Sequence, residues 1–141
     1  MTRRIRDVMT PGAVAVEPMT SVEKAARLMS EHNVGDVLVA YDCDLFGVLT
    51  DRDIVVRSLA AGRDPHDTPV GLVCSRPPVV TVTADDTTDH AEELMRRHAI
   101  RRIPVVEHGG CPVGMVSLGD LAVTEHPRSA LADISRAGPN H

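Results

Sequence analysis

The sequence predicts a mixed α/β (α+β) fold made of two tandem copies of one unit, and three observations support this prediction. First, segments 14–34 and 80–100 align without a gap at an offset of 66 residues (80 − 14 = 66), which is the pattern of an internal repeat. Second, the alignment continues after one inserted residue, so that Asp53 matches Asp120 at an offset of 67 (120 − 53 = 67). Third, each copy passes from short β-branched runs to apolar residues at helical spacing and back. Each unit is therefore predicted to be strand, helix, strand, strand, helix.

Each unit opens with a short strand and a helix. The runs "AVAV" at 13–16 and "VVTV" at 79–82 are apolar and bounded by Pro or Gly, which is typical of buried strands. Thr20 has capping-box spacing to Glu23 and predicts the start of the first helix, and Asp86 is the expected cap of its counterpart. Both helices carry one apolar stripe, formed by Val22, Ala25, Ala26, Leu28 and Met29 in the first unit and by Ala91, Leu94 and Met95 in the second.

Two more strands and a second helix complete each unit. The strand-like runs, separated by loops of hairpin length, are "DVLVAY", "LFGVLT", "RIPVVE" and "PVGMVS". The closing helix "DRDIVVRSLAAG" is predicted to end at Gly62 and its counterpart before Pro127, with a further short helix over 128–135 ahead of a frayed end. The predicted domains are residues 1–62 and 70–126, with a linker at 63–69 and a C-terminal tail at 127–141.

The composition argues against nucleic-acid and membrane partners. Fifteen basic and twenty acidic residues give a formal charge of −5, which disfavours a general affinity for phosphate backbones or anionic membranes. Tyr41 and Phe46 are the only aromatic residues, too few for a base-stacking platform. The basic start is not followed by an apolar stretch of signal-peptide length, and no later run is long enough to span a membrane. We expect a cytoplasmic protein.

The cysteines and histidines predict no metal site. Three widely spaced cysteines, Cys43, Cys74 and Cys111, suit neither a disulfide framework nor a paired-cysteine zinc site, so we expect three reduced thiols. Cys43 and Cys111 fall in corresponding loops of the two units, which leaves a redox bridge between them as the alternative. His108 and Cys111 share a loop but would need ligands from elsewhere to bind zinc.

The doubled unit resembles the cystathionine-beta-synthase (CBS) domain pair, or Bateman module, in its short free-standing bacterial form. Each copy finishes in Gly-apolar-apolar-[Thr/Ser]-x-x-Asp, and "HAIRRIPVV" and "IRDVMTPGAVAV" are similar to the family's strand-entry and opening segments. The match covers residues 5 to about 124. The resemblance implies two CBS domains related by pseudo-two-fold symmetry and a disc-like dimer of two pairs.

The resemblance also implies a role for the repeated [Thr/Ser]-x-x-Asp motif. The family's Asp binds the ribose hydroxyls of an adenine nucleotide and the Thr or Ser meets the phosphate, which assigns Asp53 and Asp120 to ribose and Thr50 and Ser117 to phosphate. A carboxylate at a helix start can accept two hydroxyl hydrogen bonds, and a helix N-terminus attracts an anion. Helix capping alone would select the same residue types, so both interpretations stand.

The two units differ in charge next to this motif. Arg101 and Arg102 stand where the resemblance implies basic side chains that contact phosphates in the cleft between the units. The alternative is that both are ordinary solvent-exposed arginines at the edge of a strand, with no ligand role. The first unit has Gly35 and Asp36 there, and Asp36 would repel a phosphate. One filled site per chain is therefore expected to dominate. The candidate ligand-binding residues are Val16, Thr50, Asp53, Val82, Arg101, Arg102, Ser117 and Asp120.

Three classes of function were compared. The leading one is a regulatory CBS protein that binds an adenine nucleotide or adenosyl ligand (AMP, ATP, NAD or S-adenosylmethionine) in the cleft between its repeats and modulates a protein partner or its own assembly. It requires no cofactor beyond that ligand. The alternative is a ligand-free dimeric interaction scaffold with a stress-related role, which Asp36 favours. An enzyme is not expected, because no Gly-rich phosphate loop, nucleophile elbow or acid–base pair appears. Apolar stripes on four helices of so small a chain predict a homodimer.

Overall fold

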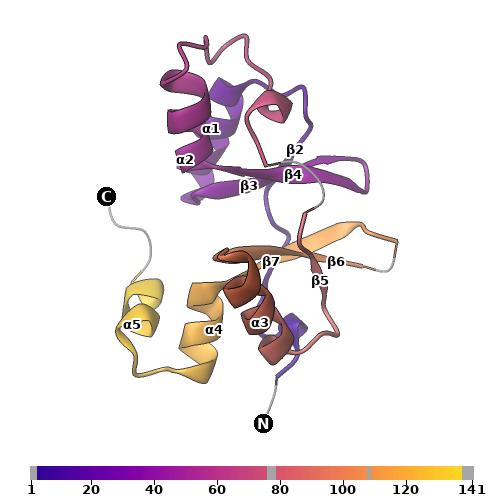
Figure 1. Cartoon of the computed structure of the whole chain (residues 1–141), viewed down its shortest axis with the longest axis vertical. Coiled ribbons are helices and arrows are strands. Elements are labelled where there is room, and N and C mark those ends of the chain that lie inside the picture. Colours follow the sequence, from indigo (N-terminus) through magenta and orange to yellow (C-terminus); the bar gives the residue numbers. More distant parts are fainter. Residues whose placement is uncertain (1–2, 76–78, 108, 138–141) are drawn as a thin grey trace. The chain divides into compact units, whose positions relative to one another are not determined.

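The computed structural model describes residues 3–75, 79–107 and 109–137 of the chain, which form two compact units (Figure 1). The first-repeat unit contains residues 13–79, and the second-repeat unit contains residues 80–137 together with residues 3–12. His108 and the last four residues of the predicted tail lie outside the described residues. No helix in the described ranges is long and apolar enough to cross a membrane.

The first-repeat unit is a three-stranded mixed sheet with helical segments on one face (Figure 1). Its strands, in the spatial order β2-β3-β4, are β2 (Ala15–Val16), β3 (Asp36–Tyr41) and β4 (Asp44–Thr50). The β2–β3 pair is parallel and the β3–β4 pair is an antiparallel hairpin. Its helical segments are α1 (Val22–His32), α2 (Asp51–Asp53), the π-helix η2 (Ile54–Leu59) and the 3₁₀-helix η3 (Val70–Leu72).

The second-repeat unit has the same order of elements plus one added strand and one added helix. Its sheet has the order β1-β7-β6-β5, formed by β1 (Thr10–Pro11), β5 (Val82–Thr83), β6 (Arg102–Val106) and β7 (Pro112–Ser117). Its helices are η1 (Ile5–Asp7), α3 (Thr88–His98), α4 (Leu118–Glu125) and α5 (Ala130–Arg136). The predicted order of strand, helix, strand, strand, helix is thus confirmed in both copies, and so is the short helix after Pro127.

The predicted helix caps are one residue too early. Ser21, and not Thr20, caps α1 by accepting a hydrogen bond from the backbone N–H of Lys24. Thr87, and not Asp86, caps α3, because the Asp86 carboxylate instead accepts from the N–H of Thr83 at 2.8 Å and closes the preceding turn. The predicted apolar stripes face the cores, since five of their residues are buried: Val22, Ala25, Met29, Ala91 and Met95.

The closing helix of the first repeat also departs from the prediction. A single turn of α-helix leads into η2, whose wider winding shows in the hydrogen bond from the N–H of Ala60 to the carbonyl of Val55, five residues back. Its counterpart α4 is an ordinary α-helix. The apolar spacing alone does not separate these two windings, because over a single turn the hydrogen-bonded spacing of a π-helix differs from that of an α-helix by only one residue.

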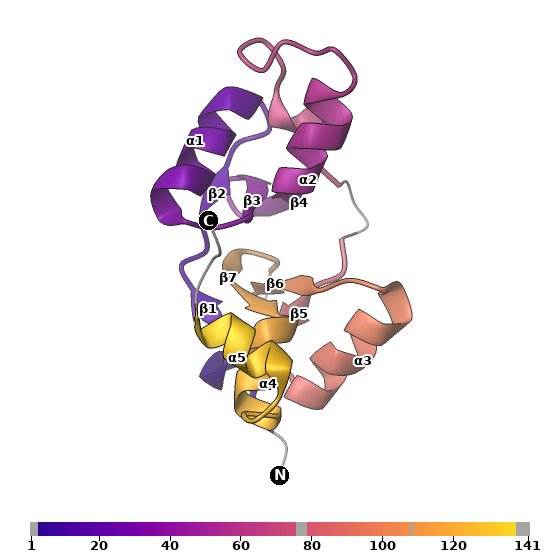
Figure 2. The same ribbon diagram turned by 90° about the vertical axis from the view of Figure 1, so that its left-hand side faces the viewer.

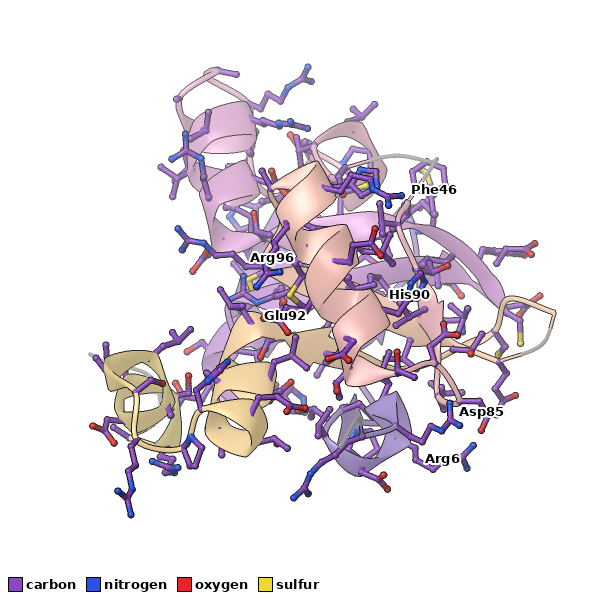
Figure 3. All side chains as sticks on the ribbon, turned by 60° about the horizontal axis from the view of Figure 1, so that its bottom comes forward. Arg6, Phe46, Asp85, His90, Glu92 and Arg96 are labelled. Carbon is purple, nitrogen blue, oxygen red and sulfur yellow. The ribbon has the colours of Figure 1, made fainter. Side chains whose placement is uncertain are left out.

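The two repeats exchange their opening segments. The segment before β2 joins the second-repeat unit, where Thr10 pairs with Met115 of β7. The segment before β5 stays with the first-repeat unit, where Ser75 bridges Val48 of β4. Figure 3 shows Arg6 of the first segment beside Asp85, with which it forms an ion pair. The predicted domain boundary at residue 62 separates the two sequence repeats. The compact units of the structure have different limits, at residues 12 and 79, because of this exchange.

Each unit encloses its own core. In the first-repeat unit Leu49, Val70 and Val73 pack with the buried faces of α1 and β3, and the half-buried ring of Phe46 covers them (Figure 3). In the second-repeat unit Ile5 is fully buried beside residues of α3, β6 and β7. Because Ile5 and Val70 each begin an exchanged segment, both cores depend on that segment.

Candidate functional site

The candidate site of the second repeat is the junction of β7 and α4. Ser117 ends the strand and is the N-cap of the helix. Its Oγ accepts a hydrogen bond from the N–H of Asp120 at 3.0 Å, and the Oδ2 of Asp120 accepts from the N–H of Ser117 at 2.9 Å. This reciprocal capping box uses one oxygen of the carboxylate and leaves Oδ1 outside the cap. Both side chains are half-buried.

The first repeat has the same junction between β4 and α2. Thr50 Oγ1 accepts from the N–H of Asp53 at 3.1 Å, and Asp53 Oδ2 accepts from the N–H of Thr50 at 3.0 Å. Here the second carboxylate oxygen is engaged, because Oδ1 of Asp53 lies 3.8 Å from Nε of Arg57. Sequence analysis missed Arg57. The repeat alignment could have revealed it, since the equivalent residue is the uncharged Thr124 (124 − 57 = 67).

The strand beside each junction, β6 in the second repeat and β3 in the first, carries charges of opposite sign. In the second repeat Arg102 pairs in register with Ser117, and the carbonyl of Arg101 accepts the N–H of Leu118 at 2.8 Å. In the first repeat Asp36 pairs in register with Thr50. The backbone of both predicted arginines thus lies beside the second junction, and the role of their side chains there stays a prediction.

Asp51 adds a further negative charge to the first junction. Its N–H donates to the carbonyl of Gly35 at 2.9 Å, and its carboxylate lies over Gly35, so close that an added Cβ would stand 3.1 Å from Oδ2. The equivalent residue of the second repeat is the apolar Leu118. The first junction therefore has two acidic residues, Asp36 and Asp51, besides Asp53, whereas the second has two arginines on the neighbouring strand entry.

The candidates Val16 and Val82 lie in the hydrophobic cores. They are 8% and 2% exposed, on the outer strands β2 and β5, which are separated from the capping boxes by β3 and β6. Their side chains are enclosed, so the structure does not bring these side chains together with Thr50, Ser117 or the aspartates. Their role in ligand binding stays a prediction.

Cysteine chemistry and metal ligation need separate treatment. Cys74 is a buried, free thiol, whereas Cys43 and Cys111 are disulfide-bonded, so the expectation of three reduced thiols is wrong for these two residues. Within the described ranges, no group of three or more His, Cys, Asp or Glu residues could hold a metal ion. His108, which could bind zinc only with ligands from outside its loop, lies outside those ranges.

Comparison with known proteins accounts for the whole repeated region. The family model "CBS domain" matches twice, over residues 5–59 and 70–124. The chain is 42% identical over 135 residues to the CBS domain-containing protein YhcV of Bacillus subtilis, covering 93% of this chain and 94% of that protein. It is 36% identical over 118 residues to Hypoxic response protein 1 of Mycobacterium tuberculosis, covering 83% and 81% of the two chains.

Solved structures agree with this assignment. The crystal structure of Hypoxic Response Protein I with two coordinated zinc ions superposes with a TM-score of 0.77 at 33% identity, covering 88% of this chain and 98% of that one. The CBS domain pair of protein MJ0100, described in complex with 5′-methylthioadenosine and S-adenosyl-L-methionine, has the same fold at a TM-score of 0.80 and 22% identity, covering 92% of this chain and all of that one. With both repeats matched in sequence and in structure, the chain belongs to the CBS-domain family and consists of two CBS domains in tandem.

Proposed function

We propose that the protein is a non-catalytic cytoplasmic regulator that binds an adenosyl ligand at the second-repeat junction. One observation carries the proposal: the Asp120 carboxylate keeps Oδ1 outside its capping box, on the junction that also holds Ser117 and Arg102. A free carboxylate oxygen suits the hydroxyls of a ribose, and an arginine suits a phosphate or carboxylate. The complex reported for the MJ0100 pair supports adenosyl compounds as the ligand class to test first.

The first-repeat junction is the weaker site in this proposal. Arg57 already forms an ion pair with Asp53, and Asp36 and Asp51 oppose a phosphate. Ligand binding at the second junction would then regulate a protein partner or the assembly of the chain itself. The name of the mycobacterial relative supports a response to stress as the setting.

The test compares Asp120→Asn with Asp53→Asn. Asparagine retains one carbonyl oxygen that can accept the N-cap N–H, so the helix start is kept while the second acceptor becomes a donor. We expect Asp120→Asn to weaken binding by about ten- to a hundredfold, the range for a lost hydrogen bond to a charged group, and Asp53→Asn to change it little. Calorimetry with AMP, ADP, ATP, NAD and S-adenosylmethionine measures both.

A ligand-free scaffold is the second candidate function. It is favoured by the capping boxes themselves, because each satisfies its hydroxyl and one carboxylate oxygen without any ligand. A ligand at a hundred times its Kd should stabilise the protein by about 2.7 kcal/mol, enough for a readable thermal shift. If no member of the panel shifts the Tm, or if Asp120→Asn binds as wild type does, the scaffold replaces the regulator.

A further inference from the structure

Helix α5 has no counterpart among the described residues of the first-repeat unit. In that unit the closing helical segment η2 is followed by η3, which already belongs to the next opening segment. In the second-repeat unit α4 leads through a short loop into α5, which packs back against it (Figure 2). The last turn of α5 therefore lies beside the first turn of α4, where the candidate site is.

A glycine on α4 makes room for this approach. A Cβ added to Gly119 would stand 2.4 Å from Oγ of Ser135 and 3.6 Å from Oγ of Ser117. A hydroxyl of α5 and the hydroxyl of the capping box thus border the same space, which a side chain at residue 119 would fill. At the offset of 67, the first repeat has Arg52 in place of this glycine. The glycine and the helix that needs it occur together at the second-repeat junction.

This packing brings Arg136 to the junction. Arg136 follows Ala132 by one helical turn, and Ala132 is fully buried. The Arg136 side chain therefore starts on the face of α5 that is turned toward α4, next to Ser135. Its guanidinium pairs with the Asp133 carboxylate at 3.3 Å, and the two side chains are 44% and 72% exposed. Exposed ion pairs contribute little to stability, so the guanidinium can turn to a bound anion with little loss.

We propose that Arg136 is a further binding residue of the second-repeat junction and contacts the anionic group of the adenosyl ligand, a phosphate or a carboxylate. A guanidinium is always charged and presents several N–H donors in one plane, which suits either group. The backbone of Arg102 borders the junction on the side of β6, and Arg136 adds a cation on the side of α5. A bound anion would also hold the last turn of α5 in place, so α5 is the element whose stability changes on binding. The inference rests on the proposed function and extends its site beyond the repeated motif.

Calorimetry on full-length variants tests the assignment. Arg136→Gln removes the charge but keeps a long side chain with high helix propensity, and we expect it to bind AMP about tenfold or more weakly, as the loss of a hydrogen bond to a charged group predicts. Its affinity for adenosine, which carries no phosphate, should stay that of the wild type. Arg128→Gln is the matched control, because Arg128 is an exposed arginine in the loop at the other end of α4, and it should bind AMP as the wild type does. Circular dichroism verifies that both variants fold.

Hydrogen exchange in α5 gives a readout that a purely structural Arg136 would not change. We expect AMP to slow exchange over residues 130–136 of the wild type but not of Arg136→Gln, and adenosine to slow it in neither. If the wild type binds none of these ligands, the proposed function fails and this assignment fails with it. If the wild type binds AMP and Arg136→Gln binds it equally well, or loses AMP and adenosine to the same extent, this assignment alone is overturned.

Discussion

At the residue scale, the capping boxes show what a short motif can and cannot predict. The pattern [Thr/Ser]-x-x-Asp correctly placed Thr50 and Ser117 at the starts of helices, because hydroxyl and carboxylate groups satisfy the free N–H groups there. The related capping-box spacing to Glu23 gave the wrong cap at α1, where Thr20 and Ser21 are both competent caps. The choice was made by tertiary contacts, since Ser21 pairs with Pro69 and the N–H of Val22 donates to the carbonyl of Thr68.

Ser58 offers a stability test at the same scale. It is fully buried in η2, and its Oγ has no hydrogen-bond partner among the described residues. A buried hydroxyl without a partner costs about 1–3 kcal/mol, so Ser58→Ala should raise the free energy of unfolding by on the order of 1 kcal/mol. Urea denaturation measures it, with the exposed Ser30→Ala as control. A loss of stability in Ser58→Ala would show that the hydroxyl binds an ordered water or stabilises the π-helix.

At the element scale, the exchange of opening segments could not be predicted from the sequence. The structure shows that Thr10 and Ser75 hold equivalent places, beside Met115 and Val48, but local sequence patterns do not say which hairpin a short edge segment joins. In each unit the approach of this segment to its hairpin requires a glycine on the hairpin. A Cβ on Gly47 would stand 1.8 Å from the carbonyl oxygen of Ser75, and one on Gly114 would stand 2.6 Å from that of Thr10. Glycine is required where these backbones approach each other.

The exchange predicts that a core mutation in one repeat destabilises the other. Ile5 and Val70 are both fully buried, and truncating a buried Ile to Ala costs about 2–5 kcal/mol. We expect Ile5→Ala to speed hydrogen exchange chiefly in α3, β6 and β7, although Ile5 precedes the first repeat in the chain. Val70→Ala, which precedes the second repeat, should act chiefly on α1, β3 and β4. Equal effects on both units, or effects on the repeat that follows in sequence, would contradict the exchange.

At the scale of the whole molecule, the fold was predictable because it is repeated. Each motif alone is weak evidence for a fold, but two copies of every motif at a matching offset are strong evidence for a tandem repeat of one unit. The charge asymmetry was also visible, in that Asp36 and Arg102 occupy the same register position opposite Thr50 and Ser117. The ion pair between Arg57 and Asp53 and the cover that α5 gives to α4 were not predicted: the alignment marks Arg57 as a departure from Thr124, but it does not say which side chain Arg57 contacts or which helix α5 packs against.

This asymmetry makes the second repeat the expected anion site of a molecule whose net charge is −5. Replacing both Arg101 and Arg102 with Ala should weaken ATP binding more than AMP binding, because the lost attraction grows with the charge of the ligand. Adenosine, which carries no phosphate, should bind the double variant almost as it binds the wild type. The difference between ATP and AMP should shrink in high salt, since both arginines are exposed and their field is screened within about 10 Å at 0.1 M salt.

Calorimetry with the three ligands decides between this role and a structural one. The Asp36→Ala variant is the matched control: removing that carboxylate should improve, or first permit, phosphate binding at the first junction without changing the second. An equal loss for adenosine, AMP and ATP in the double-arginine variant would mean that the arginines support the strand rather than the phosphate. Two equivalent sites per wild-type chain would show that the carboxylates of Asp36 and Asp51 do not exclude a phosphate from the first junction.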